Sequence, residues 1–242
     1  MLAGAGVLAG FMNTLAGGGS LLTLPALLLV GLPADVANGT NRVAILAQTV
    51  ASTGFFDREG RLDRSGLWPL LLPSLLGAAV GATVASRLPP EILRPVLLAV
   101  MSAIALLLLV APGVLSPQTA GEARRKPGPS ALGAFFLIGM YGGFAQAGVG
   151  IFLLAGLGGL LRYDLVHANA MKGAIAAGFT LLSLAIFLFA GQVRWVPGLA
   201  LAVGMVLGAR LGVLLAVRSG GTILKRVVLL LVLISCAAAW LR

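Results

Sequence analysis

Long, uninterrupted apolar runs recur along the chain and dominate its pattern. They cover residues 67–86, 96–112, 173–191, 195–217 and 227–241. Most of them approach the roughly 20 residues that a helix needs to cross the hydrocarbon core of a bilayer. The runs are continuous, whereas the strands of a membrane β-barrel alternate apolar and polar residues. The pattern therefore predicts an all-α integral membrane protein that crosses the bilayer several times.

The two halves of the chain resemble each other. A shift of 131 residues aligns residues 16–98 with residues 147–229 without a gap. Matches of alanine or leucine mean little in such a composition, so the informative matches are polar or glycine. They include Gly17 with Gly148, Gly19 with Gly150, Asn38 with Asn169 and Thr49 with Thr180. We therefore predict two tandem repeats, residues 1–112 and 131–242, joined by a polar linker at 113–130.

Glycines interrupt the first apolar segment of each repeat. The first break is Gly17-Gly18-Gly19-Ser20, and the second spans Gly142-Gly143 and Gly148-Val149-Gly150. Broken membrane segments tend to line a cavity, because their freed backbone groups need partners away from lipid. Close helix packing through small residues is the alternative, and it fits the spacings Gly77/Gly81 and Gly208/Gly212 better. Each repeat is predicted to contain a glycine-broken or re-entrant first segment plus three spanning helices.

The distribution of charge bears on topology and on partners. Seventeen Lys and Arg against seven Asp and Glu give a net charge of +10, but no basic patch interleaved with aromatic residues indicates nucleic-acid binding. If the broken segments each cross the bilayer, its two sides carry eight basic residues each; if they enter and return, the counts are eleven and five. Cytoplasmic loops carry an excess of basic residues. The asymmetry therefore favours inverted repeats, with the linker in the cytoplasm and both termini outside.

A helix with a polar face follows each broken segment. The polar residues recur at helical spacing, as Asn38, Asn41, Arg42, Thr49 and Ser52 and then as Asn169, Lys172, Thr180 and Ser183. A polar face on a membrane helix is expected to point into the protein. Arg42 and Lys172 occupy nearly equivalent positions, although snorkelling of both to the interface is an alternative. Two cations beside the N–H groups of half-helix N-termini predict an anion site.

We expect the anion to be bound by the two breaks and by the polar helices beside them. The candidate substrate-binding residues are Gly17, Gly18, Gly19, Ser20, Asn38, Asn41, Arg42, Gln146, Gly148, Gly150, Asn169 and Lys172. The only histidine is His167, the only cysteine is Cys236, and no acidic residue lies deep in an apolar run. We therefore expect no enzyme, no metal site and no cofactor.

All seven acidic residues lie in or beside connections. Carriers driven by protons or sodium commonly use an intramembrane carboxylate. We therefore expect export that is driven by the membrane potential, with alternating access at the interface of the repeats. A carrier coupled to protons or cations through Asp35 or Asp164, and an anion channel of the same fold, stay open as alternatives.

The sequence resembles the sulfite exporter TauE/SafE family of membrane transporters. The resemblance lies in residues 10–20 (GFMNTLAGGGS), Pro25 and 37–42 (ANGTNR) of the first repeat, and in 139–144 (GMYGGF), 148–150 (GVG), 168–172 (ANAMK) and 191–193 (GQV) of the second. It implies a multi-pass protein of the bacterial inner membrane that exports sulfite, sulfoacetate or a related organosulfonate. The expected partners are this small anion and the lipid bilayer, and a homo-oligomer stays open.

Overall fold

The computed structural model describes residues 2–110 and 124–240, except for the side chains of residues 105, 108–110 and 218–240. Every regular element in these ranges is helical, as predicted. The helices before the linker are α1 (Leu2–Ala16), α2 (Ser20–Leu29), α3 (Ala34–Arg58), α4 (Arg64–Arg87) and α5 (Pro90–Val110). Those after it are α6 (Pro129–Phe144), α7 (Val149–Ala155), which continues as the π-helical turn η2 (Gly156–Leu160), α8 (Leu165–Phe189) and α9 (Trp195–Trp240). Of the predicted linker, residues 113–123 lie outside the described ranges.

The outer surface of the bundle is apolar. Among the described residues three helical stretches are long and apolar enough to cross a membrane, namely α4, α8 and the Trp195–Val217 part of α9. On α4, side chains four residues apart point outward, since Leu72, Leu76, Val80 and Val84 are all about half exposed or more. A continuous apolar stripe of this kind is costly in water and suits contact with lipid. The protein is therefore a membrane protein.

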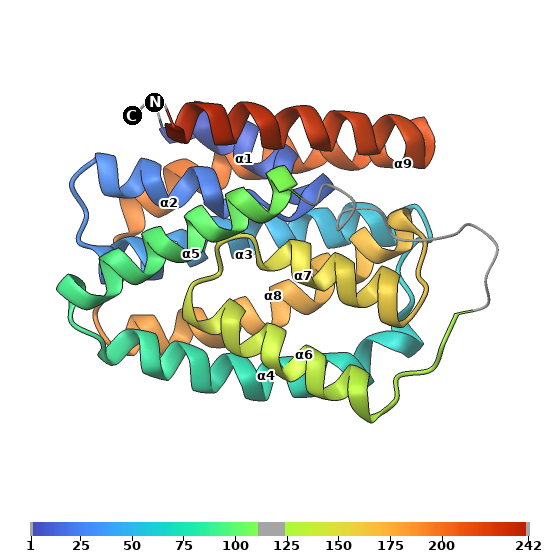
Figure 1. Ribbon diagram of the computed structural model, residues 1–242, viewed down its shortest axis with the longest axis horizontal. Coiled ribbons are helices and arrows are strands. Elements are labelled where there is room, and N and C mark those ends of the chain that lie inside the picture. Colours follow the sequence, from blue (N-terminus) through green and yellow to red (C-terminus); the bar gives the residue numbers. More distant parts are fainter. Residues whose placement is uncertain (1, 111–123, 241–242) are drawn as a thin grey trace.

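Each broken segment forms a hairpin of two short helices. Figure 1 shows α1 running inward and α2 returning to the end of the bundle where α1 began, while α6 and α7 form the same shape from the opposite end. Gly17 after α1 has φ +77° and Gly148 before α7 has φ +67°. Backbone in this left-handed region favours glycine, because a Cβ would crowd the following carbonyl. The glycines thus permit the two reversals.

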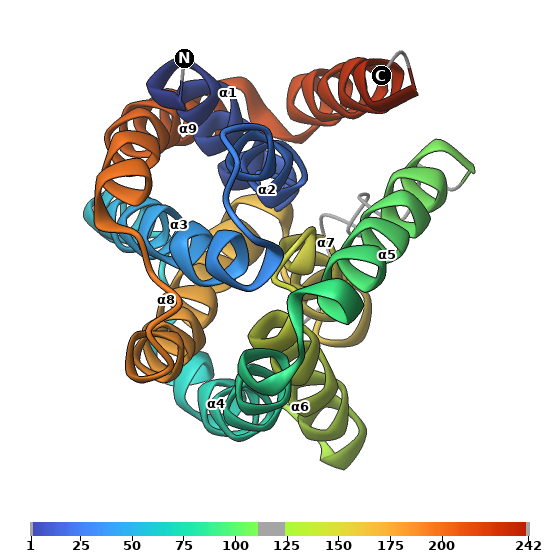
Figure 2. The same ribbon diagram turned by 90° about the vertical axis from the view of Figure 1, so that its left-hand side faces the viewer.

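The first helix of each predicted repeat packs along a helix of the other repeat. α1 lies beside the first part of α9, and α6 lies beside α4 (Figures 1 and 2). Gly77 and Gly81 of α4 face the backbone of α6 near Met140, and Gly208 of α9 faces the backbone of α1 at Val7. The GxxxG spacings are thus confirmed as sites of close helix contact.

The end of the second repeat differs from the prediction. The runs 195–217 and 227–241 indicate two separate helices, but α9 is one continuous helix of 46 residues. Its course changes direction between the orange and red parts in Figures 1 and 2. In the first repeat Pro89 and Pro90 separate α4 from α5, and proline cannot donate a backbone hydrogen bond. The equivalent Gly220-Gly221 keep their N–H groups, so helical bonding continues there.

Candidate functional site

A small internal cavity lies where the two broken segments meet. It has about 20 Å³ open to the centre of a water molecule, and α1, α2, α3, α8 and the segment before α7 all contribute to its wall. The polar residues that line it are Asn13, Ser20, Gln48, Thr49, Ser52, Gln146 and Lys172. A polar cavity inside apolar helices is a candidate binding site, because polar side chains are costly to bury in such an interior.

Lys172 of α8 reaches across to the end of α1. Its Nζ donates to the backbone oxygens of Asn13 and Thr14, both at 2.8 Å, and to Oδ1 of Asn169 at 2.6 Å. α1 ends at Ala16, so both carbonyls belong to its last turn, and that of Asn13 also accepts from the N–H of Gly17 at 2.9 Å. Lys172 therefore caps the negative end of α1, while its side chain also lines the cavity.

Arg42 of α3 caps the C-terminus of α6 in the same way. Its guanidinium donates to the backbone oxygens of Gly142, Gly143 and Phe144, which end that helix. It also donates to Oε1 of Gln146 at 2.8 Å and stacks 4.5 Å from the centre of the Phe187 ring. Arg42 is completely buried, which excludes snorkelling to the interface.

The two cations therefore bind the C-termini of α1 and α6. The N-termini that were predicted to lie beside the cations are those of α2 and α7. Ser20 begins α2 and Gly150 lies in the first turn of α7, and both line the cavity. N–H groups in a first helical turn lack intrahelical partners and carry partial positive charge. Each half of the chain thus contributes the beginning of a helix to the cavity and a cation to the broken helix of the other half.

Positive charge inside the described part of the bundle has no buried carboxylate to balance it. Arg42 and Lys172 are the only charged side chains buried there. The described acidic residues are all at least partly exposed, and they lie near helix ends or in connections. No group of three or more metal-binding side chains occurs among the described residues either. The site is therefore suited to an anion.

Buried amide side chains connect the cations to the cavity. Gln146 accepts from Arg42 and donates to Thr180 Oγ1 at 2.6 Å. It is buried and has φ +59°, an uncommon conformation for a residue other than glycine. Gln48 accepts from Asn13 Nδ2 at 2.6 Å and donates to Thr14 Oγ1 at 2.9 Å.

Sequence reasoning missed Asn13 and Gln48. Gln48 follows Asn41 by seven residues, which places both on one face of a helix, and Asn13 is a lone amide in an apolar run. Both signals were available in the sequence.

Apart from Arg42, the candidates predicted from the sequence fall into three groups. Ser20, Gln146, Gly150 and Lys172 line the cavity. The others stand behind its wall: Asn38 donates to the backbone oxygen of Phe144 at 2.7 Å, Asn41 bonds Ser20 and Thr23, and Asn169 holds Lys172. Gly17, Gly18, Gly19 and Gly148 form the reversals themselves and are not part of the lining.

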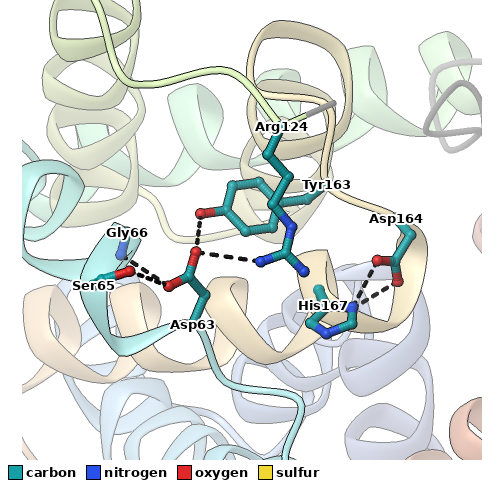
Figure 3. A network of polar contacts seen from close by, with 7 residues as sticks. All are labelled: Asp63, Ser65, Gly66, Arg124, Tyr163, Asp164 and His167. Atoms are coloured by element: carbon teal, nitrogen blue, oxygen red, sulfur yellow. Dashed lines mark hydrogen bonds and ion pairs between the residues drawn. The ribbon is translucent and has the colours of Figure 1, made fainter. Parts of the chain in front are cut away.

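A second polar network joins the connections at one end of the bundle (Figure 3). Asp63 caps α4 by accepting from the Gly66 N–H, and Tyr163 donates its hydroxyl to the same carboxylate at 2.7 Å. Arg124 lies 3.4 Å from Asp63 and 4.9 Å from the centre of the Tyr163 ring. The bond from Ser65, with those from Tyr163 and Gly66 and the charge of Arg124, lowers the pKa of Asp63 to about 2. Arg124, which precedes α6, thereby contacts both halves of the chain.

A bundle with a lipid-facing surface, two broken helices and a buried polar site between them is the architecture of a membrane transporter. The chain belongs to the sulfite exporter TauE/SafE family, whose profile matches residues 2–239. The resemblance seen in the sequence is thus confirmed.

Curated relatives are also described as transporters. The chain is 32% identical to the "Probable membrane transporter protein ORF9" of Sinorhizobium sp. over 97% of this chain and 88% of that protein. It is 30% identical to a "Probable membrane transporter protein" of Haemophilus influenzae over 93% of this chain and 88% of that one. It is 28% identical to the "Probable membrane transporter protein YfcA" of Escherichia coli K12 over 93% and 82%. No solved structure matches the chain.

Proposed function

We propose that this protein is a secondary transporter that exports a small anion, sulfite or an organosulfonate such as sulfoacetate, across the bacterial inner membrane. The observation that carries the proposal is a cavity lined by Lys172 and by neutral hydrogen-bond donors, with no carboxylate buried in the described part of the chain. A buried positive charge without a fixed counter-ion attracts an anion and repels a cation. The name of the family supports a sulfur oxyanion as the substrate.

The membrane potential supplies the driving force in this proposal. An inside-negative potential is worth about 2.3 kcal/mol per charge per 100 mV, so an anion leaves the cell downhill and a dianion gains about twice as much. No coupling ion is required. No carboxylate side chain among the described residues is fully buried, and this supports the proposal, because proton-driven carriers commonly use a carboxylate deep in the membrane.

We place the site at the interface of two inverted repeats that give alternating access. Two observations support this arrangement: the broken hairpins enter from opposite ends of the bundle, and each cation caps the broken helix of the other repeat. The cavity has room for a group the size of a water molecule. Binding of a larger anion therefore requires the repeats to move apart, and that movement would open the site.

One observation favours a second candidate, a carrier coupled to protons or cations. Asp35 lies in the first turn of α3, and its Oδ1 is buried without a hydrogen-bond partner. Such an oxygen can bind a proton or a cation. Replacement of Asp35 by Asn separates the two functions, because an anion exporter would keep its transport and a carrier coupled through Asp35 would lose it.

The test is efflux of sulfoacetate and sulfite from proteoliposomes under an imposed inside-negative potential, without a proton or sodium gradient. We expect efflux that increases with the potential and that Lys172→Met abolishes. Lys126→Met makes the same chemical change at an exposed position and serves as the matched control. Efflux that requires an imposed proton or sodium gradient would contradict the proposal.

A further inference from the structure

The two long polar helices, α3 and α8, end in the same way at opposite ends of the bundle (Figure 1). Each is followed by a glycine in the left-handed region, Gly60 with φ +66° and Gly191 with φ +72°. The N–H of the next residue donates to the carbonyl of Phe56 in α3 and to that of Phe187 in α8, both at 3.0 Å. This is the Schellman motif of a helix C-terminus. Phe56 and Phe187, which the shift of 131 residues aligns in the sequence, therefore hold the same place in their helices.

Both phenylalanines continue the polar face of their helix. Ser52 precedes Phe56 by four residues, and Ser183 precedes Phe187 by four residues, so the members of each pair share a face. The two aromatic side chains are almost completely buried, with 1% of Phe56 and none of Phe187 exposed. Each line of polar side chains thus ends in a buried aromatic ring, and the two rings lie at opposite ends of the bundle.

Phe187 covers the side of the site on which Arg42 lies. Gln146 lines the cavity and accepts from Arg42, and the guanidinium in turn lies 4.5 Å from the centre of the Phe187 ring. Just beyond the ring, a Cβ added to Gly39 of α3 would strike the backbone oxygen of Gln192, so the chain after α8 lies directly against α3. A path from the cavity past Arg42 is therefore closed by the ring and then by this backbone contact.

Phe56 occupies the equivalent place at the other end. Ser52, one turn before it, lines the cavity, and Phe56 belongs to the apolar cluster that contains Tyr163 and Leu165 next to the beginning of α8. Tyr163 also donates its hydroxyl to Asp63 in the α3–α4 connection. The connection that follows each phenylalanine is thus held near the beginning of the other polar helix.

We propose that Phe56 and Phe187 are the two gates of the transporter, where a gate is a side chain that must leave its place before the cavity opens to one side. Phe56 closes the cavity towards the α3–α4 end, and Phe187 closes it towards the α8–α9 end. Because the rings belong to different helices, one can move while the other stays in place, as alternating access requires. The inference deepens the proposed function and rests on its alternating access.

The experiment measures access to the cavity from each side separately. In the full-length Cys236→Ala protein, Thr49→Cys places a single thiol in the cavity wall, and an impermeant methanethiosulfonate is added to spheroplasts or to inverted vesicles. We expect Phe187→Ala to speed labelling at least about ten-fold from one side only, because truncation removes buried contacts that favour the closed end. Phe56→Ala should have this effect from the other side only. If the α3–α4 end is cytoplasmic, Phe187→Ala acts in spheroplasts and Phe56→Ala in inverted vesicles.

A buried phenylalanine elsewhere serves as the matched control. Phe135 is as completely buried as Phe187, but it belongs to α6 and continues neither polar face. Phe135→Ala should not speed labelling from either side. Phe56→Leu and Phe187→Leu lose less volume, and each should show the one-sided effect of its alanine variant to a smaller extent. They keep the test available if an alanine variant does not fold, which thermal unfolding without the reagent reveals.

The outcomes separate this inference from the choice of substrate. Labelling that the variants of Phe56 and Phe187 speed equally from both sides, or leave unchanged, would overturn the two gates. Equal acceleration by Phe135→Ala would overturn them as well, because any buried truncation would then open the bundle. The labelling needs no substrate. Proteoliposomes that release no sulfite or sulfoacetate would therefore contradict anion export, while one-sided labelling would still support the gates.

Discussion

Gly17 and Gly150 lie against each other where the two broken segments meet. A Cβ added to either glycine would collide with the backbone of the other, at the Cα of Gly150 in one case and of Gly17 in the other. Neither position has space for a side chain, so the breaks approach as closely as two backbones can. The cavity lies at this junction, and Gly150 forms part of its wall.

The first prediction concerns this contact. Gly17→Ala should destabilise the protein by about 2–5 kcal/mol, because alanine at φ +77° is strained and its methyl group also strikes Gly150. Thermal unfolding in detergent measures the change. Gly60→Ala is the control, since Gly60 has φ +66° but no atom within 4 Å of an added Cβ. Equal losses at the two positions would show that backbone strain alone matters.

The second prediction separates the two buried cations. Arg42→Met should lower the free energy of unfolding by about 2–4 kcal/mol, because the carbonyls of Gly142 and Gly143 lose their donor in an interior that lacks water, whereas that of Phe144 keeps its bond from Asn38. Lys172→Met should lower it by about 1 kcal/mol, since water in the adjoining cavity can replace the lost bonds to Asn13 and Thr14. Anion binding should nevertheless be lost in Lys172→Met.

Thermal unfolding and sulfite titration of both variants check the assignment. A larger loss of stability in Lys172→Met, or unchanged stability with lost binding in Arg42→Met, would reverse the roles given to the two residues.

The sequence was sufficient to find most of the helices, the breaks and the two buried cations, although it predicted two helices where α9 is one. Glycines and charges inside apolar runs are local signals, and Gly17, Gly148, Arg42 and Lys172 all stand out in this way. The hydrogen-bond partners of the two cations could not be predicted from such local signals. Arg42 contacts Gly142, one hundred residues away, and that contact depends on the register of α3 against α6.

Which end of each broken helix a cation contacts could not be predicted from the sequence either. Sequence reasoning placed the cations beside half-helix N-termini, whereas Lys172 and Arg42 bind the C-termini of α1 and α6. Both ends of a break lie within a few residues in the sequence, so spacing does not distinguish them. Side-chain reach in three dimensions decides which end a cation caps.

The third prediction concerns pH at the network around Asp63. Its pKa in the folded protein is about 2, below the ordinary value of 3.8. The carboxylate therefore stabilises the fold fully above about pH 4, and this contribution is lost as the pH falls towards 2. We expect an effect of at most about 1 kcal/mol, because solvent screens charges at the end of the bundle.

Thermal unfolding of the unaltered protein and of Asp63→Asn, measured from neutral pH down to about pH 2, checks this prediction. The variant should be less stable near neutral pH, and the difference should shrink in acid. A difference that stays constant with pH would mean that the charge of Asp63 contributes nothing to stability.

The fourth prediction concerns orientation. Arg61 and Arg194 are exposed in the α3–α4 and α8–α9 connections, which lie at opposite ends of the bundle in Figure 1. The α3–α4 end also holds Arg58, Arg64 and Arg124, so we expect this end, with its excess of basic residues, to lie in the cytoplasm. In a Cys236→Ala background, an impermeant maleimide should label Arg194→Cys in spheroplasts and Arg61→Cys only after lysis. The reverse pattern would invert the orientation and turn the proposed export path around, whereas labelling of both from one side would contradict the arrangement of the helices itself.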